Sequence, residues 1–261
     1  MKIISFNING MRARPHQLEE IKKKYDPDVI ALQEIKVSDE DFPPEIPESL
    51  GFKYFNYGQK SFHGVAIFSK EEPIKVVKGL DGGKDEEQKR FIQCDYETEI
   101  GTISICNSYF PQGENRKHPL KFPYKDRYYK RITEYLSGLD NHIVLTGDFN
   151  IAPFENDVWS HKSLLNVVSH TKAETNYFSK LLKYGAFEDI IRNNFKQDDK
   201  IYTWWSYRNK DWKKSNRGRR LDHILISKNI KKYIQSVKIY RNIRDEKKPS
   251  DHVPISVTLE V

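Results

Sequence analysis

Short apolar runs of the length of a β-strand recur along the whole chain, separated by polar residues. They lie at residues 2–8, 28–33, 64–69, 91–96, 102–109, 142–147, 221–227 and 253–259. Apolar runs of about four to eight residues between polar breaks are typical of strands in a buried sheet. The pattern therefore predicts strands throughout the chain, but it leaves their order in a sheet open.

Helical patterns fall between some of these runs. They cover residues 15–25, a segment that begins at Pro123, residues 174–184 and residues 187–195. Proline is favoured in the first turn of a helix, where its missing N–H would have no partner. Strands interspersed with helices, with no internal repeat or linker, predict an α/β or α+β sandwich in a single domain, residues 1–261. The polar stretches 81–90 and 208–220 are short enough to be loops within it.

Composition narrows the class of protein. Hydrophobic residues make up 37% and aromatic residues 13% of the 261 residues, so the chain is too aromatic to be disordered. The two cysteines, Cys94 and Cys106, exclude a disulfide framework and a multi-cysteine zinc module, and they are expected to be small core residues. The chain has no run of about 18 apolar residues and no apolar leader, so a soluble protein of the cytoplasm is expected.

Polar side chains stand where several of the apolar runs begin or end. They are Asn7, Asn9, Glu34, Tyr109, Asp148, Asn150, Asp222, Asp251 and His252. Each alone is ordinary, because Asp and Asn at strand ends often form Asx turns. In the sequence GDFN, however, Asp148 and Asn150 are two residues apart, so an extended backbone points both side chains to one face. Gly147 leaves room there for close backbone approach.

The chemistry of this set favours a hard cation. Asp251 and His252 are adjacent, so they converge on one site only if the chain turns before Pro254. Carboxylates and amides are ligands that suit Mg²⁺ or Mn²⁺ rather than zinc. A metal, an imidazole and polar donors together suit hydrolysis of a phosphate ester.

Cationic and aromatic residues alternate in two segments. The chain carries 44 Lys and Arg against 37 Asp and Glu, and this excess of +7 permits a polyanionic partner without identifying one. Residues 208–220 hold seven Lys or Arg and follow Trp204 and Trp205, and residues 116–131 repeat the pattern. Such a combination suits a phosphate backbone and exposed bases. The alternative is a solvated face whose aromatic side chains pack inward, which is the expectation for Tyr128 in a helical stripe.

Seven motifs, in order and at compatible spacing, resemble bacterial exonuclease III, the apurinic/apyrimidinic endonuclease branch of the endonuclease/exonuclease/phosphatase superfamily. They are FNINGMRAR at 6–14, ALQEIKV at 31–37, YFPQGENRKHPLKFPYK at 109–125, LTGDFNIAP at 145–153, YTWWSYR at 202–208, NRGRRLDHIL at 216–225 and KPSDHVP at 248–254. The resemblance covers nearly the whole chain. It implies a four-layer sandwich of two packed mixed β-sheets flanked by helices, with the active site where the loops of the sheets converge.

The resemblance also implies roles for the residues at the strand ends. Glu34 is expected to be the principal metal ligand. The full set of expected ligands is Asn7, Glu34, Asp148, Asn150, Asp251 and His252. The expected catalytic residues are Tyr109, Asp148, Asn150, Asp222 and His252. Among them, Tyr109 would contact the phosphate, Asn150 would hold the water and the scissile phosphate, and Asp148 would orient or deprotonate the water or protonate the leaving group. Asp222 would fix the ring of His252, whose cation would bind a phosphate oxygen.

DNA contacts are expected from further residues of the same motifs. Trp204 falls where the family places an aromatic side chain in the abasic pocket. The other expected contacts are Arg90, Gln112, Lys213, Lys214 and Arg217. Two departures from the family pattern are the segment 155–172, which predicts different loop contacts, and Arg219, which stands where the animal branch has a bulky aromatic and predicts a more open pocket.

The leading hypothesis is a Mg²⁺-dependent nuclease, with Mn²⁺ as a substitute, that incises duplex DNA 5′ to abasic sites and digests 3′ ends. In-line attack by water would leave a 3′-hydroxyl and a 5′-phosphate, and a monomer associated with the nucleoid is expected. The second hypothesis is the same chemistry on RNA, a phosphoinositide or sphingomyelin. The third is a non-catalytic nucleic-acid-binding module, which ranks last because carboxylates beside a phosphate would repel it.

Overall fold

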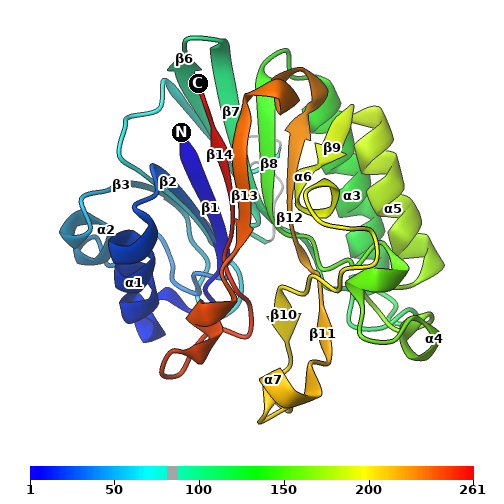
Figure 1. Ribbon diagram of the computed structural model, residues 1–261. Coiled ribbons are helices and arrows are strands. Elements are labelled where there is room, and N and C mark those ends of the chain that lie inside the picture. The colour runs from blue at the N-terminus through cyan, green and yellow to red at the C-terminus, as the bar shows by residue number, and fades with distance from the viewer. Residues whose placement is uncertain (81–87) are drawn as a thin grey trace.

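Two six-stranded mixed sheets pack face to face in a computed structural model that describes residues 1–80 and 88–261 (Figure 1). The first sheet has the strand order β13-β14-β1-β2-β4-β3, in which β1 and β2 are parallel. Its strands are β1 (Lys2–Asn7), β2 (Val29–Gln33), β3 (Lys53–Tyr57), β4 (Val65–Ser69), β13 (Ile234–Ile239) and β14 (Ile255–Leu259).

The second sheet has the order β5-β6-β7-β8-β12-β9, in which β7 and β8 are parallel. Its strands are β5 (Lys75–Lys78), β6 (Phe91–Thr98), β7 (Gly101–Tyr109), β8 (His142–Asp148), β9 (Phe187–Asp189) and β12 (Asp222–Ser227). A short ribbon of β10 (Trp204–Trp205) and β11 (Gly218–Arg219) stands apart from both sheets, at the lower end of the molecule in Figure 1. Each predicted apolar run overlaps one of these strands.

Helices cover the outer faces of the two sheets. The helices are α1 (Pro15–Tyr25), α2 (Glu45–Ser49), α3 (Lys121–Ser137), α4 (His161–Leu164), α5 (Lys172–Tyr184), α6 (Ile190–Asn193) and α7 (Trp212–Ser215), with 3₁₀ turns at Met11–Ala13, Glu155–Asp157, Lys228–Tyr233 and Arg241–Asp245. Leu18 and Ile21 of α1 pack on the first sheet, and Ile132 of α3 and Phe178 of α5 pack on the second (Figure 1). The predicted four-layer α/β sandwich is confirmed. Within the described part of the chain, no helix combines the length and the apolar character that crossing a membrane requires.

The prediction of a helix over residues 187–195 was wrong in its first turn. Phe187–Asp189 is strand β9, which pairs with β12, and the helix begins only at Ile190. The side chain of Asp189 accepts a hydrogen bond from the N–H of Arg192 and so caps α6. The helix expected to open at Pro123 begins two residues earlier, at Lys121.

The buried positions of the cysteines and of Tyr128 agree with the sequence predictions, whereas the two polar stretches differ from them or fall outside the described residues. Cys94 and Cys106 are fully buried, as expected: Cys94 lies between the two sheets, and Cys106 packs with residues of α3 on the outer face of the second sheet. Tyr128 is buried in the apolar stripe of α3. The stretch 208–220 is not one loop, because it contains α7 and β11. The loop expected at 81–90 falls mainly on residues 81–87, which lie outside the described residues.

A buried polar bridge ties the two sheets together below the site. The Nδ2 of Asn107 on β7 donates to the carbonyl oxygens of Leu32 at 2.8 Å and Ala66 at 2.9 Å, both in the first sheet. The Nε2 of Gln33 at the end of β2 donates back to Oδ1 of Asn107 at 2.7 Å. Buried hydrogen bonds of this kind hold packed elements in one arrangement. The bridge therefore fixes the end of β2 relative to the end of β7, and residues that follow both strands belong to the site.

Candidate active site

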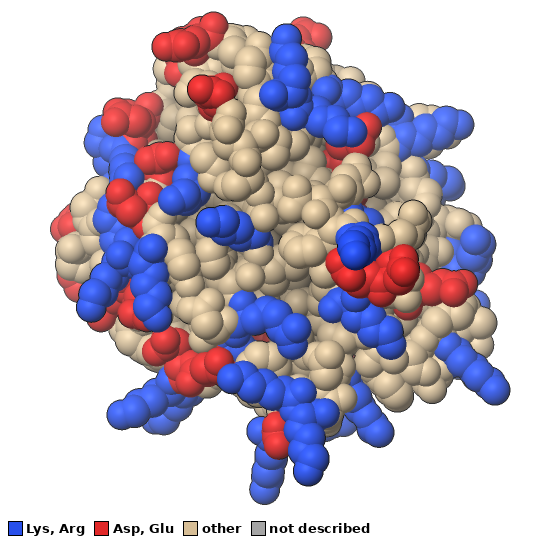
Figure 2. Space-filling model, in the orientation of Figure 1, with Lys and Arg blue, Asp and Glu red and all other residues tan. Residues whose placement is uncertain are grey.

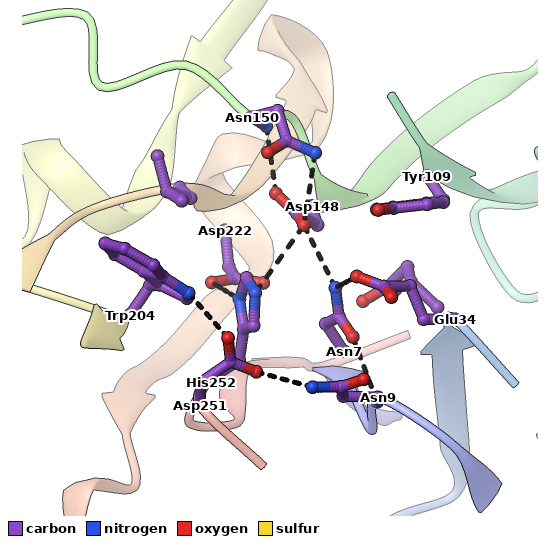
Figure 3. Close-up of polar contacts among 12 residues, drawn as sticks. Asn7, Asn9, Glu34, Tyr109, Asp148, Asn150, Trp204, Asp222, Asp251 and His252 are labelled. Atoms are coloured by element: carbon purple, nitrogen blue, oxygen red, sulfur yellow. Dashed lines mark hydrogen bonds and ion pairs between the residues drawn. The ribbon is translucent and has the colours of Figure 1, made fainter. Parts of the chain in front are cut away.

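Three of the predicted residues stand side by side at the ends of adjacent strands of the second sheet. Tyr109 on β7 pairs in register with Asp148 on β8, and Asp148 pairs with Asp222 on β12. Figure 3 shows Asn7 and Glu34 approaching Asp148 from the ends of β1 and β2 of the first sheet. The site therefore lies where the two sheets meet, and its residues come from both.

The carboxylates of Glu34 and Asp148 are joined by one amide. The Nδ2 of Asn7 donates to Oε1 of Glu34 at 2.9 Å and to Oδ2 of Asp148 at 3.0 Å. The Oδ1 of Asp148 accepts the N–H of Asn150 at 2.9 Å, and the Nδ2 of Asn150 donates to the carbonyl of Phe110. These donors hold two carboxylates close together, an arrangement that repulsion alone would oppose.

The glycine of GDFN is required by packing. Gly147 has φ of +146°, and a Cβ placed there would lie 1.9 Å from the carbonyl oxygen of Ser108 on β7. Any side chain would thus force the parallel strands β7 and β8 apart. The close backbone approach expected from the sequence is present, and it brings Asp148 next to Tyr109.

His252 and Asp222 form a buried ion pair. The Nδ1 of His252 lies 2.8 Å from Oδ2 of Asp222, and its Nε2 lies 3.7 Å from Oδ2 of Asp148. Burial alone would lower the pKa of His252, but Asp222 and Asp148 outweigh it and raise that pKa to about 10. The imidazole is therefore a cation held between two carboxylates, with one edge fixed by Asp222.

The pKa of Asp148 is raised to about 7. Burial is the main cause, His252 opposes it, and the charges of Asp222 and Glu34 add to it. Burial, with the charges of Glu34 and Asp148, also raises the pKa of Tyr109 well above its ordinary value, so its phenol stays protonated at neutral pH. The site thus offers one group that exchanges a proton near neutrality and one fixed donor.

Three of the six predicted ligands lie close together, and two of them, Glu34 and Asp148, could share one cation. Ligand atoms of Glu34, Asp148 and His252 all lie within 4.8 Å of one another. Two carboxylates and their oxygen atoms fit a hard divalent ion, whereas His252 in its cationic form cannot bind one. Asn7 and Asn150 lie beside this group as hydrogen-bond donors.

Asp251 has other partners. Its Oδ1 accepts from Nδ2 of Asn9 at 2.9 Å, and its Oδ2 accepts from Nε1 of Trp204 at 2.8 Å (Figure 3). The chain turns at Asp251, so both it and His252 line one pocket, as the convergence requires. Asp251 therefore fixes the position of Trp204 and links the ribbon to the site.

A pocket of about 240 Å³ opens beside the carboxylates. Its lining includes Trp204, Arg219, Leu221, Tyr109 and Gln112. Trp205, the next residue, is fully buried. The two tryptophans thus point to opposite faces, with Trp204 in the pocket, as expected from their adjacency.

Of the other residues expected to contact DNA, Arg90 is buried, whereas Lys213, Lys214 and Arg217 lie on the surface. Arg90 is only 4% exposed, donates from Nη1 to the carbonyl of Tyr109 at 2.9 Å and stacks on that ring, so it braces Tyr109 from below the surface. Lys213, Lys214 and Arg217 are exposed, and Lys213 pairs with Asp245 at 2.7 Å. Figure 2 shows basic side chains gathered at the lower end of the molecule, where α7 lies in Figure 1.

Comparison with known proteins identifies the family. The model of the endonuclease/exonuclease/phosphatase family matches residues 4–252. The chain belongs to this family. It is 44% identical to exodeoxyribonuclease III of Haemophilus influenzae over 98% of both chains. Among solved structures, it is similar to an AP endonuclease from Archaeoglobus fulgidus (TM-score 0.92, 32% identity) and to the 3′ phosphatase NExo from Neisseria bound to a product DNA hairpin (TM-score 0.92, 30% identity), each over 100% of both chains. The predicted family is confirmed, and the protein is a nuclease.

Several residues of the active site had no role predicted from the sequence. Asn9 binds Asp251, and the Nζ of Lys36 lies 2.9 Å from Oε2 of Glu34 and also contacts Oδ1 of Asn9. Each stands two residues after an assigned residue, and that spacing was the available signal. His63 packs on the ring of Tyr109, and burial, with Arg90 and Lys36 nearby, lowers its pKa to about 3. No pattern in the sequence marks His63.

Proposed function

We propose that the protein is a metal-dependent DNA-repair nuclease that incises duplex DNA 5′ to abasic sites and removes nucleotides or blocking groups from 3′ ends. The observation that carries the proposal is the buried Asp222–His252 pair, 2.8 Å apart, beside a second carboxylate pair at the mouth of a pocket. A binding module has no use for such a group, because uncompensated carboxylates repel phosphate.

A divalent cation, Mg²⁺ or Mn²⁺, would be held by Glu34 and Asp148 and would neutralise charge on the phosphate oxygens. His252, kept cationic by Asp222, donates to a phosphate oxygen that gains charge in the transition state. The protonated phenol of Tyr109 donates to another. These donors are fixed before the substrate arrives, so little reorganisation is needed during the reaction.

Asp148 moves the proton. It is placed to take a proton from the attacking water or to return one to the leaving 3′-oxygen. Its Oδ1 accepts the N–H of Asn150, and its Oδ2 accepts from Asn7, so the carboxylate has one orientation. In-line attack would leave a 3′-hydroxyl and a 5′-phosphate.

The pocket supports recognition of a sugar that lacks its base. An abasic nucleotide loses little stacking and no pairing when it leaves the duplex. The planar wall of Trp204, held by Asp251, can pack against the bare sugar, whereas the small pocket excludes an intact nucleotide. The relatives with an exodeoxyribonuclease, an AP endonuclease and a DNA-bound 3′ phosphatase in their titles support DNA as the substrate.

We further propose that the protein acts as a monomer of one domain over residues 1–261, associated with the nucleoid in the cytoplasm. The exposed basic side chains near α7 would contact phosphates of the duplex without reading its sequence.

The test compares two duplexes, one with a single tetrahydrofuran abasic analogue and one undamaged and blunt, each with Mg²⁺, Mn²⁺ or EDTA. We expect incision 5′ to the analogue and slower loss of 3′ nucleotides, both abolished by EDTA. Phosphoinositide and sphingomyelin substrates should remain intact. Cleavage that persists in EDTA, or hydrolysis of a lipid in preference to both duplexes, contradicts the proposal.

A further inference from the structure

Arg219 lies on β11 and lines the active-site pocket. Its guanidinium carbon lies 5.6 Å from the centre of the Trp204 ring. Its Nη1 donates to the carbonyl of Val168 at 2.9 Å and to Oγ of Ser169 at 2.7 Å. The arginine expected to leave the pocket more open than a bulky aromatic would thus itself forms part of the wall.

Among the described residues, no carboxylate pairs with Arg219. The adjacent Arg220 shows the contrast, since it is fully buried and its nitrogens reach Asp157 at 2.7 Å and Asp189 at 2.8 Å. Both hydrogen bonds of Arg219 go to neutral acceptors from one nitrogen, and its Nε and Nη2 have no partner there. Burial lowers the pKa of Arg219, and the charge of Glu174, which pairs directly with Lys125, opposes this only in part. The shift reflects the cost of removing this cation from water without a carboxylate in direct contact. A ligand anion would offset that cost.

The position of Arg219 in the pocket indicates where such an anion would come from. Glu34, Asp148 and His252 line the same pocket, so a phosphate bound at those residues directs one of its ester groups toward Trp204 and Arg219. That ester group is the fragment that keeps the phosphate after the bond to the 3′-oxygen breaks. In an ordinary abasic site the fragment is a neutral sugar, which gives a guanidinium little to bind.

We propose that Arg219 is a specificity-determining residue that binds a carboxylate on the fragment esterified to the scissile phosphate. The class of substrate is a 3′ end blocked by an oxidised sugar remnant, such as a 3′-phosphoglycolate. A planar guanidinium pairs with a carboxylate through two parallel hydrogen bonds, and Arg219 has two nitrogens available for them. The inference rests on the proposed function of the same site.

The reaction is a hydrolysis that needs only water. The water oxygen attacks phosphorus, the bond between phosphorus and the 3′-oxygen breaks, and one proton of the water ends on that oxygen. The products are a free 3′-hydroxyl and phosphoglycolate, whose carboxylate stays on Arg219 until release.

The test measures kcat/KM on three duplexes that differ in the blocking group: a 3′-phosphoglycolate, a 3′-phosphate and an internal tetrahydrofuran. Arg219→Gln keeps a side chain that can donate to Val168 and Ser169 but removes the charge, and Arg219→Lys keeps the charge without the planar fork. Arg127→Gln, an exposed arginine of α3, is the matched control. We expect Arg219→Gln to lower the ratio of phosphoglycolate to phosphate by at least about tenfold, Arg219→Lys to lower it less, and the control to leave it unchanged.

Inhibition by small molecules gives a readout that does not depend on DNA binding. 2-Phosphoglycolate should inhibit the wild type more strongly than methyl phosphate, and Arg219→Gln should abolish the difference. If the ratio is unchanged in both variants while their melting temperatures match the wild type, the inference is wrong and the proposed function stands. An equal loss on all three duplexes also overturns it, because Arg219 would then bind the DNA chain. A wild type that cleaves none of the duplexes refutes the proposed function itself.

Discussion

Replacing Asp222 or His252 should reveal that the two act as one unit. Nδ1 of His252 lies 2.8 Å from Oδ2 of Asp222, and neither side chain is more than 5% exposed. Removing one partner of a buried pair costs about 3–5 kcal/mol, which corresponds to roughly 10²- to 10³-fold or more in rate if the pair acts on the transition state. Asp222→Asn removes the charge and His252→Asn removes the cation, so each should lower kcat by at least about 100-fold.

The double variant decides between coupling and independence. Because each single change already destroys the pair, Asp222→Asn/His252→Asn should be within about threefold of the poorer single variant. Independent residues would instead lose roughly 10⁴-fold or more. The assay is single-turnover incision of the tetrahydrofuran duplex with saturating Mg²⁺, with melting temperatures to confirm folding and Asp198→Asn, an exposed aspartate, as control. Multiplicative losses refute the reasoning that Asp222 works through His252.

Three further predictions concern recognition, binding and stability. Trp204→Ala should raise the activation free energy of abasic incision by about 1–3 kcal/mol with little change in melting temperature. Trp205→Ala, which empties a fully buried site, should lower the free energy of unfolding by about 3–5 kcal/mol. The reverse pattern would mean that Trp205 lines the pocket and Trp204 belongs to the core. Neutralising Lys213 and Lys214 should weaken binding to all duplex sequences alike and reduce the salt slope by up to about 2, and an unchanged slope would place both lysines away from DNA. Arg220→Met should destabilise the fold by about 3–5 kcal/mol at pH 7, because the buried carboxylates of Asp157 and Asp189 both lose their nearest cation. Burial alone would raise the pKa of Asp189, but Arg220 outweighs it and holds that pKa well below its usual value. The wild type therefore loses this stabilisation as pH falls below about 4, and the deficit of the variant should shrink there. A deficit that grows in acid, measured by denaturant titration, would contradict this.

The pattern of apolar residues predicts the central strands well and the edge strands poorly. β1, β2, β7 and β8 are covered on both faces, so their sequences are continuous apolar runs. β3, β5 and β13 were not predicted, because edge positions leave many of their side chains in water and their sequences are mixed. β9 is only three residues long and leads directly into α6, so its apolar residues were assigned to the helix.

The candidate site could be assembled from the sequence only in part. Strand ends identify which polar residues meet, but the partner of each depends on strand order, which no local pattern contains. Asp251 was expected among the metal ligands from the family resemblance, and the hydrogen bonds of its carboxylate with Asn9 and Trp204 are partners that no local pattern indicates. Arg90 was expected to contact DNA, and the fold places it under Tyr109, a position that no local pattern indicates.

A Mg²⁺ titration of Glu34→Gln tests most directly whether Glu34 holds the cation that the reaction needs. Glu34 lies within 4.8 Å of Asp148 and His252, and the change removes one charge while keeping the shape of the side chain. The rate of incision at the tetrahydrofuran site is measured across Mg²⁺ concentrations, with the exposed Glu99→Gln as control. The account predicts that the Mg²⁺ concentration for half-maximal rate rises at least about tenfold in Glu34→Gln and stays at the wild-type value in the control. A Glu34→Gln protein that incises normally at low Mg²⁺ would contradict it.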